Sequence, residues 1–179
     1  MRFLPILLVV LLSACQSTTP SLTSPYYAIP VGSKFVLHEP VTIPAGKASV
    51  YIQRGKIVPY NGRDTYYANC QFEVYTIRST AYTVQPDEFV VNKVRSRIEL
   101  NRYFEPGTLL AQMGGGRGDI TSKYYARLFY LHSTKQPDVL RMTCGRWDYR
   151  AFSNQLTIDE IRGTLGGIFT VNLSVPIPG

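Results

Sequence analysis

The chain has 179 residues, of which 45% are hydrophobic and 17% are charged, and its formal net charge at pH 7 is +7. A chain of this length can form one domain with a sizeable hydrophobic core. It contains only two histidines and no Cys-x-x-Cys pair, so its composition argues against a zinc site. We expect neither a metal nor a cofactor.

Residues 1–14 have the parts of a secretory signal peptide. Arg2 provides a positive start, and residues 3–12 are almost wholly apolar. This run is too short for a membrane-spanning helix, which needs roughly 20 apolar residues. It ends in the sequence LSAC, residues 12–15, which resembles the lipobox of bacterial lipoproteins. The alternative is an ordinary secreted protein that is cut nearby and keeps Cys15 in its tail.

The lipobox resemblance implies that the signal peptide is removed and that Cys15 receives the lipid. Several acyl chains on one residue anchor a protein stably to a membrane. The next residue is Gln16, whereas the enterobacterial lipoproteins that stay in the inner membrane commonly have Asp there. The resemblance therefore predicts a protein of the cell outer membrane, anchored by its lipid and facing the periplasm.

The rest of the chain divides into a tether and one domain. Residues 16–30 are rich in Ser, Thr and Pro, and this composition predicts an extended, flexible segment. Residues 31–179 contain no internal repeat and no second linker, so we expect a single β domain. Its moderately positive charge suits an envelope of anionic lipids and carboxylated peptidoglycan, although many soluble domains carry a similar charge.

Strand patterns dominate this domain. Seven runs are rich in Tyr, Val, Ile, Thr and Phe, and turn-forming residues separate most of them. They predict an all-β fold, an antiparallel β-sandwich or small barrel of about seven strands. In chain order the runs are residues 34–44, 48–58, 68–78, 88–100, 124–133, 138–145 and 168–175.

One short C-terminal helix is expected within residues 156–167. Thr157 is a candidate N-cap and Glu160 follows three residues later, which is the capping-box arrangement. Gly166 and Gly167 predict a left-handed end. The helix should cover one end of the sheet with Ile158, Ile161 and Leu165.

The two remaining cysteines, Cys70 and Cys144, form an even pair in an oxidising compartment. The alternation of apolar residues around each of them directs both thiols into a core. We predict a disulfide that contributes about 4 kcal/mol on the chain-entropy model. The alternative is two buried free thiols. Trp147 is expected to pack against the bridge.

A basic stripe is the main candidate binding feature. Lys93, Arg95 and Arg97 alternate onto one face of the strand at 88–100, about 6–7 Å apart, with apolar residues on the other face. Three like charges in a row repel one another unless something offsets them. Either Glu99 or a neighbouring acidic strand does so, or the stripe binds phosphates or carboxylates of an envelope component. The compartment makes nucleic acid a poor candidate.

The remaining motifs do not indicate a specific binding or catalytic site. Residues 113–120 (MGGGRGDI) lack the ending of a phosphate-binding loop, and the RGD within them is a short match, so a flexible loop is the favoured interpretation. The thirteen tyrosines can stack on sugars, line an interface or cover a small β core. His38 and His132 belong to no nucleophile–base motif. We therefore expect no enzymatic activity.

Four segments resemble one family of small Gram-negative lipoproteins with no known activity: YANCQFEV, VQPDEFVVNKV, MTCGRW and LTIDEIRGTLGGIFTV. The resemblance covers most of residues 31–171 and implies a location, not a mechanism. The leading hypothesis is a module that binds or scaffolds an envelope component, namely a protein, peptidoglycan or lipopolysaccharide. The alternatives are a small-ligand carrier, which needs a wide apolar interior, and an envelope enzyme, which needs a histidine–carboxylate pocket.

Overall fold

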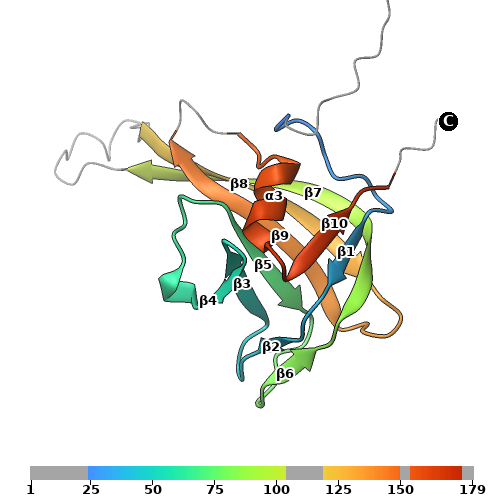
Figure 1. The fold of residues 1–179 in the computed structure, drawn as a ribbon. Helices are drawn as coiled ribbons and strands as arrows, with labels where there is room; N and C mark the ends of the chain where they lie inside the picture. The colour runs from blue at the N-terminus through green and yellow to red at the C-terminus, as the bar shows by residue number, and fades with distance from the viewer. Residues whose placement is uncertain (1–23, 104–118, 150–153, 175–179) are drawn as a thin grey trace, which may run out of the picture.

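The computed structural model describes residues 24–103, 119–149 and 154–174. These residues form ten strands and one α-helix, which confirms the all-β fold with a short C-terminal helix (Figure 1). Eight strands make one antiparallel sheet that curls into a half-barrel, and two strands make a small second sheet. Of the helices in the described ranges, none has the length and hydrophobicity needed to cross a membrane.

The large sheet has the strand order β10-β1-β7-β8-β9-β5-β3-β4, and the small sheet pairs β2 with β6. The longest strands, β7, β8 and β9, lie together at the centre of the order. The strands are β1 (Lys34–Leu37), β2 (Val41–Ile43), β3 (Ser49–Gln53), β4 (Lys56–Val58), β5 (Asn69–Val74), β6 (Tyr82–Val84), β7 (Asp87–Tyr103), β8 (Asp119–His132), β9 (Val139–Tyr149) and β10 (Phe169–Asn172). The helix is α3 (Ile158–Leu165), and a 3-10 turn, η2 (Tyr60–Gly62), follows β4.

The strand number exceeds seven because two of the expected runs each fold as two strands. Residues 34–44 break between β1 and β2, which join different sheets. Residues 48–58 turn back at Arg54 and Gly55, whose φ angles are 54° and 70°. Positive φ at both central residues is the geometry of a tight two-residue hairpin, so β3 and β4 pair with each other. The remaining strand, β6, is three residues long and was not expected.

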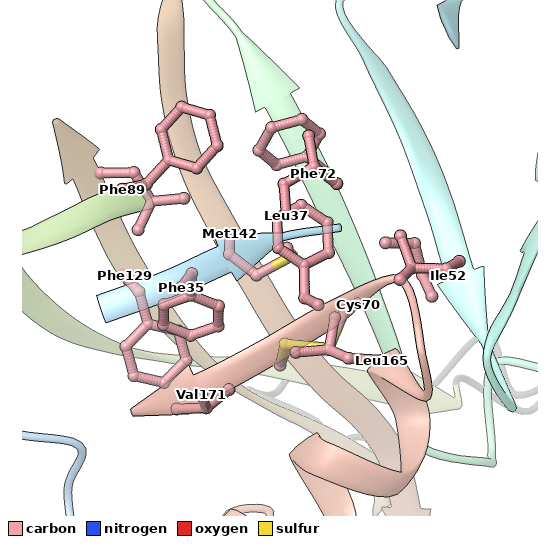
Figure 2. Close-up of a cluster of buried hydrophobic side chains, with 14 of the residues drawn as sticks. Phe35, Leu37, Ile52, Cys70, Phe72, Phe89, Phe129, Met142, Leu165 and Val171 are labelled. Atoms are coloured by element: carbon pink, nitrogen blue, oxygen red, sulfur yellow. A yellow bond between two sulfur atoms is a disulfide. The ribbon is translucent and has the colours of Figure 1, made fainter. Parts of the chain in front are cut away.

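The concave side of the curled sheet holds the hydrophobic core (Figure 2). Five phenylalanines there are at most 2% exposed, and several of their rings are in contact. Phe35 and Phe129 have ring centroids 5.4 Å apart, and those of Phe72 and Phe169 lie 5.1 Å apart. Side chains therefore fill the interior of the described half-barrel.

The disulfide is present as predicted. Cys70 of β5 and Cys144 of β9 are directly opposite each other, with an S–S distance of 2.03 Å, and both are buried in the core. The expectation for Trp147 was wrong. Because this residue lies three positions beyond Cys144, it points to the opposite face of β9 and packs on Tyr124, at a centroid distance of 5.5 Å.

Helix α3 begins and ends as predicted. The Thr157 hydroxyl accepts a hydrogen bond from the Glu160 N–H, and the Glu160 carboxylate accepts one from the Thr157 N–H. Burial raises the pKa of the Glu160 carboxyl, but the Thr157 N–H and the Arg146 guanidinium outweigh it and hold that pKa below its usual range. The expected apolar residues Ile158, Ile161 and Leu165 are all buried.

The end of α3 rests directly on the β3–β4 turn. Gly166 caps the helix with a φ of 56°, and a Cβ atom there would lie 2.5 Å from the Cα of Gly55. The Gly55 N–H donates to the carbonyl of Thr164 at 2.9 Å. The helix contacts β10 on one side and β3 and β5 on the other. It therefore bridges the region between the two edges of the half-barrel (Figure 1).

The described part of the expected tether is tied to the domain. Ile29 is fully buried in the core. The guanidinium of Arg127, which is buried in β8, donates to the carbonyl oxygens of Tyr27 and Pro25, the latter at 2.6 Å. Packed contacts therefore extend toward the N-terminus beyond residue 31.

Candidate ligand groove on the outer face

The basic stripe lies on the face of the large sheet that points away from the core, which we call the outer face. The register of β7 against β8 shifts between Val91 and Lys93, so Asn92 is an extra residue in β7. Beyond this bulge Lys93, Arg95 and Arg97 alternate along one face of β7, and all three are exposed. The predicted alignment of the three cations is therefore present.

The three cations have different surroundings. Arg97 forms an ion pair with Glu99 at 2.6 Å. Glu99 therefore reduces the repulsion among the three cations, which is the alternative to ligand binding that the sequence left open. The Lys93 Nζ lies 5.5 Å from the centroid of the Tyr130 ring. Arg95 has no ion-pair partner among the described residues. Glu99 therefore neutralises only one end of the stripe.

The Arg97 end of the stripe opens into a groove of about 220 Å³. We call it the outer-face groove and define it by five residues from four parts of the chain. Arg97 and Glu99 come from β7, Tyr124 from β8, Trp147 from β9, and Arg63 from the loop that follows β4. Strand pairing brings the first four together, whereas Arg63 arrives only because its loop folds over the sheet.

Hydrogen bonds from two residues, Gln53 and Trp147, hold that loop over the outer face. The buried side chain of Gln53 donates to the carbonyl of Asp64 at 2.8 Å and accepts from the Asp64 N–H at 3.0 Å. The N–H of Trp147 donates to the carbonyl of Thr65 at 2.8 Å. Because one amide side chain and one strand fix the loop backbone, the position of Arg63 is determined by the fold.

Arg63 stacks on two aromatic rings at the rim of the groove. Its guanidinium carbon lies 4.2 Å from the ring centroid of Tyr51 and 5.0 Å from that of Tyr60. The two rings contact each other edge to face at 5.8 Å. Within the described residues Arg63 has no carboxylate partner. A stacked guanidinium keeps its N–H donors free in its plane, which is a suitable geometry for binding phosphate or carboxylate.

The floor of the groove is aromatic and polar. Trp147 and Tyr124 form a pair there, with Thr143 beside them. Burial raises the pKa of the Tyr124 phenol and Glu99 raises it further, while Arg63 and Arg97 act in the opposite direction. The pKa is raised on balance, so the hydroxyl stays protonated at neutral pH and can donate a hydrogen bond. It makes none to the residues that the structure describes.

The charges of the groove favour an anion. Two guanidinium groups, Arg63 and Arg97, face it with one carboxylate, Glu99. Aromatic faces and neutral hydrogen-bonding groups fill the space between them. Such a surface can stack on an apolar ring face and bind hydroxyl, carboxylate or phosphate groups.

The two histidines lie elsewhere. His38 pairs with the hydroxyl of Thr170 at 2.6 Å, and His132 is exposed at the end of β8. In the parts of the chain that are described, neither histidine contacts a carboxylate. These parts also contain no cluster of three or more His, Cys, Asp or Glu residues that could hold a metal.

Ser133, next to His132, belongs to a turn. Its hydroxyl donates to Asp87 at 2.5 Å and accepts from the backbone N–H groups of Lys135 and Gln136. Burial raises the pKa of the Asp87 carboxyl, but the hydrogen bonds that it accepts outweigh this effect and hold the pKa below its usual range. The Asp87–Ser133 contact therefore stabilises the turn.

Sequence reasoning found Arg97 but missed Arg63, Tyr51 and Tyr60 as groove residues. In the sequence these residues lie in or near the segment PYNGRDTYY, whose composition predicts a loop. Composition does not predict that this loop packs over the outer face of the sheet. Cys15 and residues 113–118 of the RGD loop lie outside the described residues. Comparison with protein-family models, curated proteins and solved structures finds no match to this chain.

Proposed function

We propose that this protein is a lipoprotein of the outer membrane, anchored through Cys15, which binds an anionic component of the envelope in the outer-face groove. One observation carries the proposal. Arg63, which has no carboxylate partner among the described residues, is held on two tyrosine rings in the groove that Arg97 of the basic stripe also lines. An oriented guanidinium with free donors is well suited to phosphate or carboxylate.

The floor of the groove narrows the choice of anion. Trp147 and Tyr124 offer aromatic surface, and Thr143 with the Tyr124 hydroxyl offers neutral hydrogen-bonding groups. Sugar rings present both apolar faces and hydroxyl groups. We therefore favour an anionic saccharide of the envelope, from peptidoglycan or lipopolysaccharide, over an acidic protein.

The two alternative functions have less support. A carrier would hold its ligand inside the barrel, but the phenylalanines of the core fill the described interior. An enzyme would be favoured by a histidine beside a carboxylate, and neither described histidine has one. The absence of enzymatic activity stays a prediction from the sequence.

Photo-crosslinking in intact envelopes tests the proposal. A photoreactive residue at Thr65, which lines the groove, should capture an envelope component. Arg63→Gln should lower the yield about tenfold or more, because a hydrogen bond to a charged group contributes roughly 1.5–3 kcal/mol. Arg97→Gln should also lower the yield, because it leaves the Glu99 carboxylate unpaired in the groove, where it repels an anion. Lys56→Gln is the matched control, since Lys56 is an exposed cation outside the groove. Equal yields from all four proteins would contradict the proposal.

The anchor is tested separately. Mass spectrometry of the mature N-terminus should find acyl chains on Cys15, and Cys15→Ser should release the protein from the membrane fraction. An unmodified Cys15 would leave the groove proposal intact but remove the lipoprotein assignment.

A further inference from the structure

We infer that the ligand is an acylated, anionic saccharide whose acyl chain lies in a second hollow beside the groove. This inference rests on the proposed function and specifies its ligand class. The second hollow has a volume of about 570 Å³ and lies between β2 of the small sheet and the β3–β4 hairpin. We call it the apolar hollow and define it by Pro44, Val50, Ile57 and Pro59.

The apolar hollow differs in chemistry from the groove. Aliphatic and proline side chains make much of its lining, and Ile57 in it is 46% exposed. Exposed apolar surface in a concave site is stabilised when an apolar group covers it. Its volume falls in the range of about 300–1,000 Å³ that is typical of small-molecule sites. An acyl chain therefore suits it in both chemistry and size.

Two residues connect the hollows. Tyr51 and Tyr60 line both of them, and their rings are in contact. On the groove side these rings carry the guanidinium of Arg63. The two sites therefore share one wall, with the Arg63 guanidinium on its groove side and mainly apolar surface on its other side. A molecule with an anionic head group and an apolar chain can place the head group in the groove and the chain in the apolar hollow.

Charge around the apolar hollow supports the same ligand class. Lys47, an exposed cation, lines it together with the apolar residues. A long lysine side chain can cover apolar surface with its stem while its ammonium group stays in water. The ammonium group can thus meet a second anionic group at the rim of the acyl site. A phosphorylated glycolipid supplies chain, sugar and charge in one molecule.

Binding by the full-length acylated protein in nanodiscs of neutral phosphatidylcholine tests the inference. The first pair of probes is glucosamine 1-phosphate and its N-decanoyl derivative, which share the head and differ in the chain. Each buried methylene raises affinity about fourfold. We expect the acylated probe to bind at least about tenfold more tightly, even if only a few methylenes are covered.

Protein variants test whether the apolar hollow binds the acyl chain of the probe and the outer-face groove binds its phosphorylated sugar. Ile57→Glu should reduce the affinity for the acylated probe to that for glucosamine 1-phosphate and leave the latter unchanged. Ile77→Glu is the matched control, because Ile77 is 65% exposed and lines neither hollow. Thr42→Trp, which fills the hollow from its other wall, should act like Ile57→Glu without adding a charge. Arg63→Gln should weaken both probes.

Three results would overturn the inference. If the wild type binds both phosphorylated probes equally and Arg63→Gln weakens both, the acyl site is refuted and the groove proposal stands. If neither probe depends on Arg63, both proposals fail. If soluble short-chain phosphatidylglycerol binds more tightly than the acylated sugar, the ligand is an anionic lipid without a saccharide and the ligand class is wrong.

Discussion

Replacing both bridging cysteines, Cys70→Ala and Cys144→Ala, should lower the free energy of unfolding by about 4–5 kcal/mol. The bridge spans a sequence separation of 74 residues, for which the chain-entropy model gives about 4.4 kcal/mol at 25 °C. The two side chains are only 0% and 1% exposed, so truncation also leaves a small cavity in the core. Because domains have roughly 5–15 kcal/mol of stability in total, the variant should be marginally stable.

Urea unfolding followed by tryptophan fluorescence measures this change. Trp147 is the single tryptophan of the chain and lies on β9, the strand that carries Cys144. Unfolding the wild type with a reductant present should remove the loop-closure contribution alone, about 4.4 kcal/mol, and the reductant should have no effect on the double variant. A loss below about 1 kcal/mol would refute the loop-closure reasoning.

Three further predictions concern the N-cap of helix α3, the stability of the domain at acidic pH and the C-terminal end of the helix. Thr157→Ala should lower the free energy of unfolding by about 1 kcal/mol in urea titrations, since it removes the N-cap hydroxyl; no change would contradict the capping role. Asp87 and Glu160 have lowered pKa values, so the stability they contribute is complete above the ordinary pKa of about 4 and is lost as the pH falls through the lowered values. The melting temperature should fall as the pH drops from about 5 toward 2, and Asp87→Asn should make that fall shallower. Gly166→Ala should destabilise by more than about 1 kcal/mol, because its φ is 56° and its Cβ would clash with the β3–β4 turn. Gly167→Ala, whose Cβ meets nothing within 4 Å, should be nearly neutral; equal effects would contradict the contact.

Local sequence patterns predicted the elements that depend on neighbouring residues. The capping box of Thr157 and Glu160 spans four residues and needs no tertiary information. Alternation along β5 and β9 directed Cys70 and Cys144 into the core, because side chains of a strand alternate between two faces. The same rule correctly placed Lys93, Arg95 and Arg97 together. It would also have placed Trp147 correctly, as the residue lies an odd number of positions from Cys144.

The parts that the sequence did not predict depend on contacts between distant residues. The bulge at Asn92 changes which residues of β7 face the core, and alternation alone cannot reveal it. Strand β6 exists because β2 leaves the large sheet and pairs with it. Arg63 reaches the groove only because Gln53 and Trp147 hold its loop. The groove is therefore a property of tertiary structure, although each of its residues is visible in the sequence.

The place of β1 in the sheet limits when the domain can fold. This strand pairs with β7 on one side and with β10, the last strand of the described chain, on the other. A chain that emerges N-terminus first, from a ribosome or across a membrane, exposes residues 34–37 long before their partners at 169–172. One edge of β1 therefore stays unpaired, open to aggregation or to a chaperone, until β10 has emerged.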